Sequence, residues 1–255
     1  MKGITQALLF AFLLLSSWAS FAADVELYVV RHGKTLFNTV HRAQGWSDTP
    51  LTAEGVEVAK KAGRGLKPVD FIAAWSSDSG RARETAKLIL AERDKSLPLQ
   101  EREALREVFF GSFEGDTNEN MLTVAGKKSG YASSAQLMTA FNSKKVDIVE
   151  IVQMIHAADP SGQAESYQQV AQRVNKVIKE IARQAQQQGG GNVLIVTHGM
   201  TIMTLLHELG DKAKTHSLSN ASVTRIRYTD AGKFIIEAID DLSYVKKGSQ
   251  LAVTQ

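Results

Sequence analysis

The amino-acid sequence predicts an α/β protein, a three-layer sandwich in which helices flank both faces of a mostly parallel sheet. Apolar, β-branched runs typical of buried strands alternate with helical patterns along the chain. The run at 192–197 is too apolar for a half-exposed strand, so we expect it to be central and parallel. Two of the strands end in His-Gly, at His32 and His198. Ligands of such sheets bind beyond the carboxyl ends of the strands, which places a candidate site there.

The individual elements follow from apolar spacing and from residues that favour helix ends. Short apolar runs predict strands over 25–30, 71–75, 97–100, 192–197, 222–228 and 233–239. Apolar residues at helical spacing predict helices over 52–66, 79–92, 166–188 and 200–209. Thr52 is a candidate N-cap, and three glycines from Gly189 end the longest helix. The last two strands are expected to form an antiparallel pair around a turn at 230–232.

The strand and helix rhythm is lost over about 116–165, which we interpret as a helical insertion over the site within a single domain at 23–255. This segment is rich in aliphatic residues. They are expected to pack on the body of the domain. An apolar wall for a lipid or aromatic phosphate is the alternative. The tail after Asp241 gives no structural signal.

Residues 1–22 resemble a secretory signal peptide. Lys2 precedes an unbroken apolar run at 7–15, and Ser20-Phe21-Ala22 fits a small-x-small cleavage site. The apolar run is short for a membrane span, so stable membrane insertion is not expected after cleavage. An uncleaved anchor is the alternative. The expected location is the periplasm or the extracellular medium.

Composition narrows the classes of function. The chain has 255 residues, of which 44% are hydrophobic and 22% charged, as in a globular protein. A formal net charge of +3 gives no indication of nucleic-acid binding. The absence of cysteine excludes disulfides, thiolate metal sites and a lipid-modified amino-terminal cysteine. Composition does not indicate an oligomeric state.

Four short motifs lie at predicted strand ends or in the loops beyond them. The first is Arg-His-Gly-Lys-Thr at 31–35, with Asn38 beyond it, and the second is Ser-Ser-Asp-Ser-Gly-Arg-Ala-Arg-Glu-Thr-Ala at 76–86. The third is Leu-Arg-Glu at 105–107, followed by Gly111 and Glu114-Gly115, and the fourth is Thr-His-Gly at 197–199. Each alone is a weak signal, but four in this order make chance a poor explanation.

With these motifs the sequence resembles the histidine phosphatase superfamily, which includes the cofactor-dependent phosphoglycerate mutases. The resemblance covers about Val25 to Ile239 and is weakest over 116–164. The first motif, which ends at Thr35, resembles that of the branch whose first motif reads Arg-His-Gly-x-Thr. Gly199 is the residue directly after the second histidine. The acid phosphatase branch instead has an Asp after its second histidine, so the resemblance implies that the acid here comes from elsewhere.

The resemblance implies a phosphohistidine intermediate on His32, and the chemistry agrees. A neutral imidazole is not repelled by a phosphate dianion, and it leaves readily from phosphorus. Its other ring nitrogen is expected to meet a backbone carbonyl, which would fix the tautomer. Glu107 would protonate the leaving oxygen and later activate water.

The remaining site residues would bind the phosphoryl group. Arg31 and Arg81 offer guanidinium forks for its oxygens. His198, if protonated beside the phosphate, adds a donor, and Asn38 could donate a further hydrogen bond. We expect no metal ion and no cofactor, since two arginines and a histidine can neutralise the charge.

Several rivals to these residues remain. Arg83 competes with Arg81, but is expected to be a solvated helix charge. Glu114 and Glu119 compete with Glu107, and fit surface loop charges better. The remaining histidines lack metal-ligand spacing; they are His41, His156, His207 and His216.

Three functions are consistent with the sequence. The first is hydrolysis of a small phosphomonoester. The second is phosphoglycerate mutase-type transfer, which needs a cytoplasmic bisphosphate primer and, in the mutases, arginines that grip a substrate carboxylate. Residues 116–165 contain no arginine, although Lys127, Lys128, Lys144 and Lys145 could partly replace them. The third is a non-catalytic protein that binds a phosphorylated ligand or partner.

The signal peptide gives the first testable prediction. The mature chain is expected to begin near Ala23 and to appear in the periplasmic or secreted fraction, because Ala22 completes the cleavage site. Amino-terminal sequencing of the fractionated protein measures this directly. An intact Met1 on protein from the cytoplasmic fraction would contradict the prediction and favour the mutase.

Overall fold

The computed structural model describes residues 23–211 and 218–251, so the expected signal peptide lies outside the described residues. Six strands form one mixed sheet in the order β3-β2-β4-β1-β5-β6. They are β1 (Val25–Arg31), β2 (Phe71–Ser76), β3 (Leu99–Glu101), β4 (Gly191–Thr197), β5 (Val223–Tyr228) and β6 (Phe234–Asp241). The strands β3, β2, β4 and β1 are parallel, whereas β5 and β6 run antiparallel to their neighbours. The predicted α/β class and the central parallel strand at 192–197 are confirmed.

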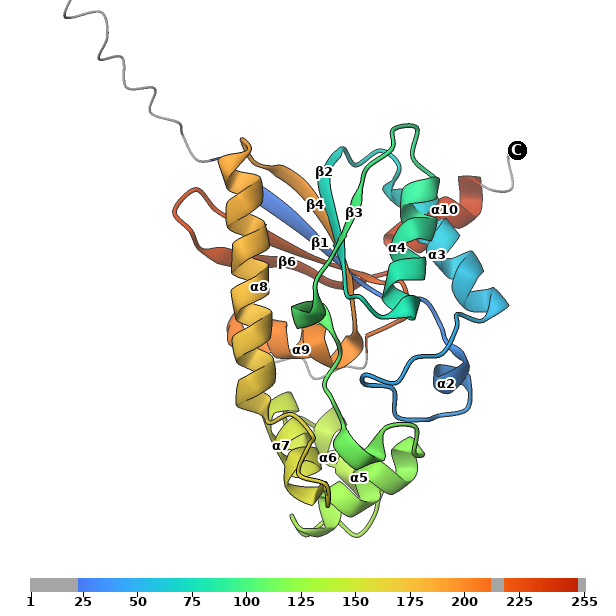
Figure 1. Cartoon of the computed structure of the whole chain (residues 1–255), viewed down its shortest axis with the longest axis vertical. Helices are drawn as coiled ribbons and strands as arrows, with labels where there is room; N and C mark the ends of the chain where they lie inside the picture. The colour runs from blue at the N-terminus through green and yellow to red at the C-terminus, as the bar shows by residue number, and fades with distance from the viewer. Residues whose placement is uncertain (1–22, 212–217, 252–255) are drawn as a thin grey trace, which may run out of the picture.

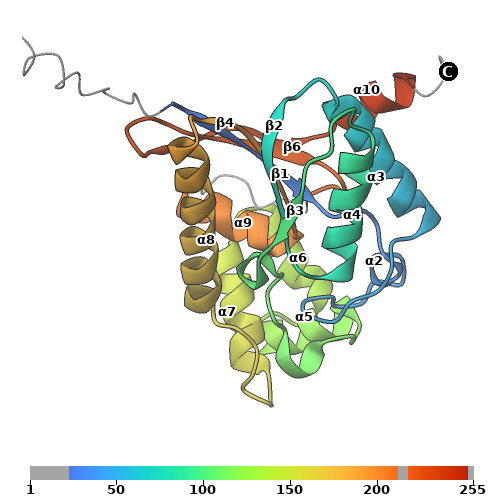
Figure 2. The ribbon, with the colours of Figure 1, turned by 45° about the horizontal axis from the view of Figure 1, so that its top comes forward.

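Helices cover both faces of the sheet (Figures 1 and 2), as the sequence predicts. The main body contains α2 (Leu36–Thr39), α3 (Ala53–Leu66), α4 (Gly80–Ala91), α8 (Tyr167–Gln187), α9 (Gly199–Glu208) and α10 (Ser243–Leu251). Two short 3-10 turns lie at Glu103–Leu105 and Gly111–Phe113. The helices α8 and α9 contact one face, and α3 and α4 lie on the other (Figure 1).

Alternate residues of the central strands belong to two separate hydrophobic clusters. Leu27 and Ile195 pack in the cluster with α8, whereas Tyr28 and Leu194 pack in the cluster with α3 and α4. This division follows from the two-residue period of a strand, whose side chains point to opposite faces. Both faces of β1 and β4 are therefore buried, and the carboxyl ends of these two strands are held rigidly.

The local signals at helix ends behave as the sequence predicts. Thr52 accepts the backbone N–H of Gly55 at the start of α3. Ser166 caps α8 in a reciprocal arrangement with Gln169, in which each side chain accepts the other's backbone N–H. Within the described part of the chain, no helix combines the length and apolar character needed to cross a membrane.

The predicted insertion is helical and consists of α5 (Asn118–Lys127), α6 (Ser134–Asn142) and α7 (Ile148–Ala158). Its helices pack on one another, and α7 also contacts α8 and α9. The group lies beyond the carboxyl ends of β1 and β4 (Figures 1 and 2). Its position at the strand ends brings it close to the candidate site.

Two helices, α2 and α10, were not predicted. The C-terminal α10 lies across α3 at a contact that only glycine allows. A Cβ on Gly65 would lie 1.9 Å from the carbonyl oxygen of Tyr244, and one on Gly248 would lie 1.8 Å from that of Lys61. The tail is short and of mixed polarity, so its helix depends on this backbone contact.

Candidate active site

The two His-Gly motifs come together because β1 and β4 are adjacent and parallel. Arg31 pairs in register with Thr197, so His32 and His198 leave the sheet side by side. Their ring centroids are 5.2 Å apart. His32 is 4% exposed and His198 is fully buried.

Hydrogen bonds indicate the tautomer of His32. Its Nδ1 lies 2.8 Å from the carbonyl oxygen of Gly33, which can only accept, so Nδ1 carries the proton. On the other side, Nε2 lies 3.3 Å from the Nε–H of Arg81 and accepts from it. The expected backbone carbonyl partner is therefore present. The arrangement leaves the lone pair of Nε2 as the nucleophilic position.

Burial favours the neutral form of both imidazoles. Burial, followed by the positive charges of Arg81 and Arg31, lowers the pKa of His32 well below its usual value of 6.5. The pKa of His198 is also lowered well below that value, first by burial and then by Arg81. A neutral His32 suits nucleophilic attack. Protonation of His198, as considered from the sequence, would require a nearby anion.

The guanidinium of Arg81 is fully buried, and protein acceptors surround it. One terminal nitrogen donates to the carbonyl of Ser47 at 3.0 Å and to the carboxylate of Asp48 at 2.9 Å. The other donates to the carbonyls of Gln44 and Gly45 at 3.2 and 2.7 Å. The two terminal nitrogens, which were expected to face a phosphate, therefore face the loop at 44–48. Only the Nε of Arg81 points to His32.

The loop around Arg81 is itself held by Glu114. The carboxylate of Glu114 accepts the backbone N–H groups of Gly45, Trp46 and Ser47 at 2.8–3.1 Å, and that of Phe110 at 3.1 Å. The expectation that Glu114 is a surface loop charge is wrong, because its side chain orders the backbone that binds Arg81. Glu119, by contrast, is exposed on α5.

Arg31 and His198 each have a buried nitrogen without a hydrogen-bond partner among the described residues: Arg31 Nε, which can only donate, and His198 Nδ1, which donates when the ring is protonated. The terminal nitrogen of Arg31 donates to the carbonyl of Leu218. Burial lowers the pKa of Arg31, and the charge of Glu107 partly opposes this effect. Unpaired buried polar groups are costly, so an anion with several acceptor oxygens is the ligand chemistry that these groups fit.

Asn38 lies beside His32 at the start of α2. Its Oδ1 accepts the N–H of Thr35 at 3.2 Å and lies 3.4 Å from the side-chain nitrogen of Asn220. Asn220 in turn donates to the carbonyl of His32 at 2.9 Å. Asn38 therefore caps a helix, and its proposed contact to a phosphate would use the amide NH2 group.

Glu107 is 6% exposed and is held by the first turn of α9. Its Oε1 accepts the N–H of Thr201 at 2.9 Å, the hydroxyl of the same residue at 3.1 Å and the N–H of Val108 at 3.0 Å. Its Oε2 accepts one donor, the N–H of Met200, at 3.0 Å. Oε2 is therefore the oxygen with capacity to exchange a proton with a substrate.

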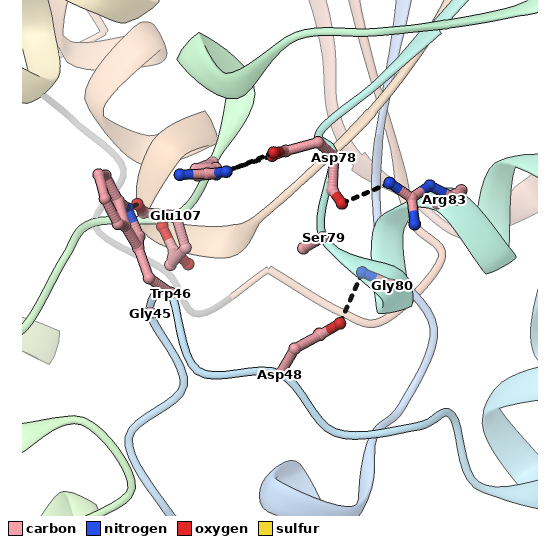
Figure 3. A pocket seen from close by; sticks show the side chains of 9 residues that line it. Gly45, Trp46, Asp48, Asp78, Ser79, Gly80, Arg83 and Glu107 are labelled. Carbon is pink, nitrogen blue, oxygen red and sulfur yellow. Dashed lines mark hydrogen bonds and ion pairs between the residues drawn. The ribbon is translucent and has the colours of Figure 1, made fainter.

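A cleft of about 430 Å³ opens at this carboxylate (Figure 3). It is lined by Gly45, Trp46, Asp48, Asp78, Ser79, Gly80, Arg83, Arg106 and Glu107. Ser79 connects the cleft to the buried histidines, since its hydroxyl lies 3.4 Å from Nε2 of His198. A small polar substrate could therefore reach both the histidine pair and Glu107.

Ion pairs line one wall of the cleft. Arg106 pairs with Asp78, with its Nε donating at 2.8 Å, and its guanidinium lies 4.8 Å from the centre of the Trp46 ring. Arg83 pairs with both oxygens of Glu101 at 2.8 and 2.6 Å. Arg83 is thus partly exposed and ion-paired, not simply solvated, and it does not contact His32 in place of Arg81.

Sequence reasoning missed the residues that support the site. Asp48 accepts the N–H of Gly80 at the start of α4 as well as Arg81, and Thr85 accepts the N–H of Gly33 at 2.9 Å. For Asp48, the one local signal in the sequence is Asp-Thr-Pro at 48–50, a pattern typical of turns. No local pattern indicated Asn220. Across 23–211 and 218–251, no group of three His, Asp or Glu side chains is arranged to hold a metal ion.

The site and fold are those of a known class: the chain belongs to the histidine phosphatase superfamily, branch 1, whose family model matches residues 27–241. The predicted resemblance is confirmed. The chain is similar to a phosphoglycerate mutase structure from Bacillus anthracis, with 47% identity, a TM-score of 0.84, and coverage of 90% of this chain and 99% of that one.

Curated relatives include both phosphatases and mutases. A metal-independent phosphoserine phosphatase of Arabidopsis thaliana is 29% identical over 224 residues, covering 86% of this chain and 83% of the relative. A 2,3-bisphosphoglycerate-dependent phosphoglycerate mutase of Cytophaga hutchinsonii is 32% identical over 183 residues, covering 72% and 76%. Family membership therefore does not distinguish hydrolysis from transfer.

The lowered pKa values of the histidine pair predict how stability depends on pH. Below about pH 6.5 the unfolded chain binds protons at His32 and His198 that the folded protein does not bind. The free energy of unfolding should therefore decrease as pH falls from 6.5 to 5, by up to about 1.4 kcal/mol per pH unit for each group. Urea unfolding across this range measures the slope. His32→Gln and His198→Gln should each reduce it, and slopes equal to that of the wild type would contradict the prediction.

Proposed function

We propose that this protein hydrolyses small phosphomonoesters outside the cytoplasm, through a phosphohistidine on His32 and without a metal ion. The observation that carries the proposal is the state of His32: burial favours its neutral form, Nδ1 is bound to a carbonyl, and the lone pair of Nε2 lies 3.3 Å from Arg81 Nε–H, on the side of the phosphate-binding residues. A neutral nitrogen nucleophile beside two arginines suits an anionic phosphorus centre.

In the first step, Nε2 of His32 forms a bond to phosphorus while the bond to the leaving oxygen breaks. Glu107, in its acid form, gives its proton to that oxygen, and the alcohol departs. In the second step, Glu107 takes a proton from a water molecule whose oxygen attacks phosphorus. The P–N bond breaks, and inorganic phosphate and neutral His32 are restored.

Charge neutralisation is assigned to Arg31, Arg81 and His198. Arg31 Nε and His198 Nδ1 are the buried positions that lack acceptors, and phosphoryl oxygens would supply them. A bound dianion would also raise the pKa of His198 and favour its protonated, donating form. Arg81 would act through its Nε, unless a phosphoryl oxygen displaces the half-buried Asp48 carboxylate.

The alternative is phosphoglycerate mutase-type transfer, which the similarity to the Bacillus anthracis and Cytophaga hutchinsonii proteins favours. Two features support hydrolysis instead. The insertion at 116–165 contains no arginine, and within the described chain its lysines are exposed and are not among the residues that line the cleft. The signal-like residues 1–22 would also separate the protein from a cytoplasmic bisphosphate primer.

The central test is covalent labelling. Purified protein given an aryl phosphate in EDTA should release phosphate, be inhibited by vanadate, and form a label that is acid-labile and alkali-stable, as a phosphoramidate is. His32→Ala should abolish both turnover and label. The substitution His41→Gln, at an exposed histidine, serves as the control and should leave both intact.

An acid-stable label, activity lost in EDTA and restored by zinc, or no turnover at all would each overturn the proposal. Isomerisation of phosphoglycerate dependent on 2,3-bisphosphoglycerate would establish the mutase.

A separate prediction tests the role of Glu107 as the acid and base. Glu107→Gln cannot deliver a proton, so turnover of alkyl phosphates should fall by about 10²–10⁴. With p-nitrophenyl phosphate, whose leaving group needs little protonation, a burst of nitrophenol should precede a slow steady state, because the water step still lacks its base.

The burst distinguishes chemistry from misfolding. The new amide NH2 would face the Met200 N–H, so some loss of stability is expected, but an unfolded enzyme gives no burst. Wild-type rates on alkyl phosphates in Glu107→Gln would show that another residue is the acid.

A further inference from the structure

A second hollow lies near Glu107. Its lining is apolar, whereas that of the cleft is polar. It has a volume of about 260 Å³ and lies between the insertion helices α5, α6 and α7 and the first turns of α9. Ten of the eleven described residues that line it are apolar, and Asn118 is the polar one. Four of the six methionines in the sequence are among them: Met121, Met138, Met200 and Met203.

The hollow is not a closed part of the core. Ile151 and Ile155, on its inner wall, are buried, whereas Leu122, Met138 and Met203 are only partly buried. The lining therefore includes both buried side chains and side chains that are partly accessible to solvent. Flexible methionine side chains adapt to irregular apolar shapes, which suits a site for variable ligands better than a tightly packed core. Its size fits a short chain or a single ring.

Two residues of the hollow contact the site of the proposed chemistry. Met200 lines the hollow, and its backbone N–H donates to Oε2 of Glu107. Phe110 also lines it, and the ring edge of Phe110 lies 3.0 Å from the position that a Cβ on Gly45 would take, while Gly45 lines the cleft. Glu107, which lines the polar cleft, is therefore one hydrogen bond away from a residue of the apolar hollow.

We propose that this hollow binds the carbon skeleton of the leaving alcohol, so that the preferred substrates are phosphomonoesters of apolar alkyl or aryl alcohols. The proposal rests on the function proposed above. With phosphorus at His32 and the ester oxygen at Oε2 of Glu107, the first carbon of the alcohol lies beside Met200. An apolar chain gains free energy by continuing into the hollow. The polar cleft is the other place where the alcohol could bind. Its charged side chains, Asp78, Arg83 and Arg106, are already in ion pairs or hydrogen bonds with protein groups.

The test uses n-alkyl phosphates from ethyl to hexyl, because the acidity of the leaving alcohol hardly changes along this series. For the wild-type protein, kcat/KM should rise about two- to fourfold per methylene until the hollow is filled. Met138→Gln, nearly equal in size but polar, should flatten this rise with chain length. Met154→Gln is the matched control, since Met154 is partly buried on α7 but does not line the hollow. It should keep the wild-type slope.

The matching n-alkyl phosphonates measure binding without turnover. Calorimetric affinities that rise with chain length in the wild type and in Met154→Gln, but not in Met138→Gln, support the assignment even if no ester is hydrolysed. A flat phosphonate series in the wild type overturns it, whether side chains fill the hollow or a second copy of the chain covers it. Equal loss of slope in both variants also overturns it. Loss of hydrolysis with an intact phosphonate slope would refute only the proposed catalytic function.

Discussion

The buried guanidinium of Arg81 is the constraint on which the site depends. A buried charge is tolerated only when its donors are satisfied, and here three backbone carbonyls and Asp48 satisfy it. Those carbonyls lie in one loop, whose N–H groups bind Glu114. The carbonyl groups of the loop thus bind Arg81, and its N–H groups bind Glu114. The arrangement forms one wall of the cleft, and the charge of Arg81 adds to burial in lowering the pKa of His32.

The sheet and its flanking helices could be predicted because their signals are local. The apolar run at 192–197 marked the central strand, and Thr52 and Ser166 marked the starts of helices where the structure has them. The helix α10 could not be predicted in the same way. Its stability depends on close approach of Gly248 to α3, a contact between residues more than 180 positions apart in the chain.

For the site, sequence reasoning found the residues at strand ends but not those that hold them. His32, Arg31 and His198 follow buried parallel strands, so topology alone brings them together. The roles of Asp48 and Glu114 depend on how a loop folds onto α4, which no short pattern encodes. Glu114 in particular was expected to be a surface loop charge. Its four backbone donors come from two separate segments, and only the folded chain brings them together.

The two unpaired nitrogens at the strand ends have a consequence for how such an enzyme would work over time. Arg31 Nε and His198 Nδ1 lack acceptors whatever the alcohol of the substrate is, so inorganic phosphate meets the same unsatisfied groups as an ester does. The product would therefore compete with the substrate for the free site, and turnover would slow wherever phosphate accumulates. In surroundings poor in phosphate the same site would turn over freely, so the enzyme would release phosphate fastest where phosphate is scarce.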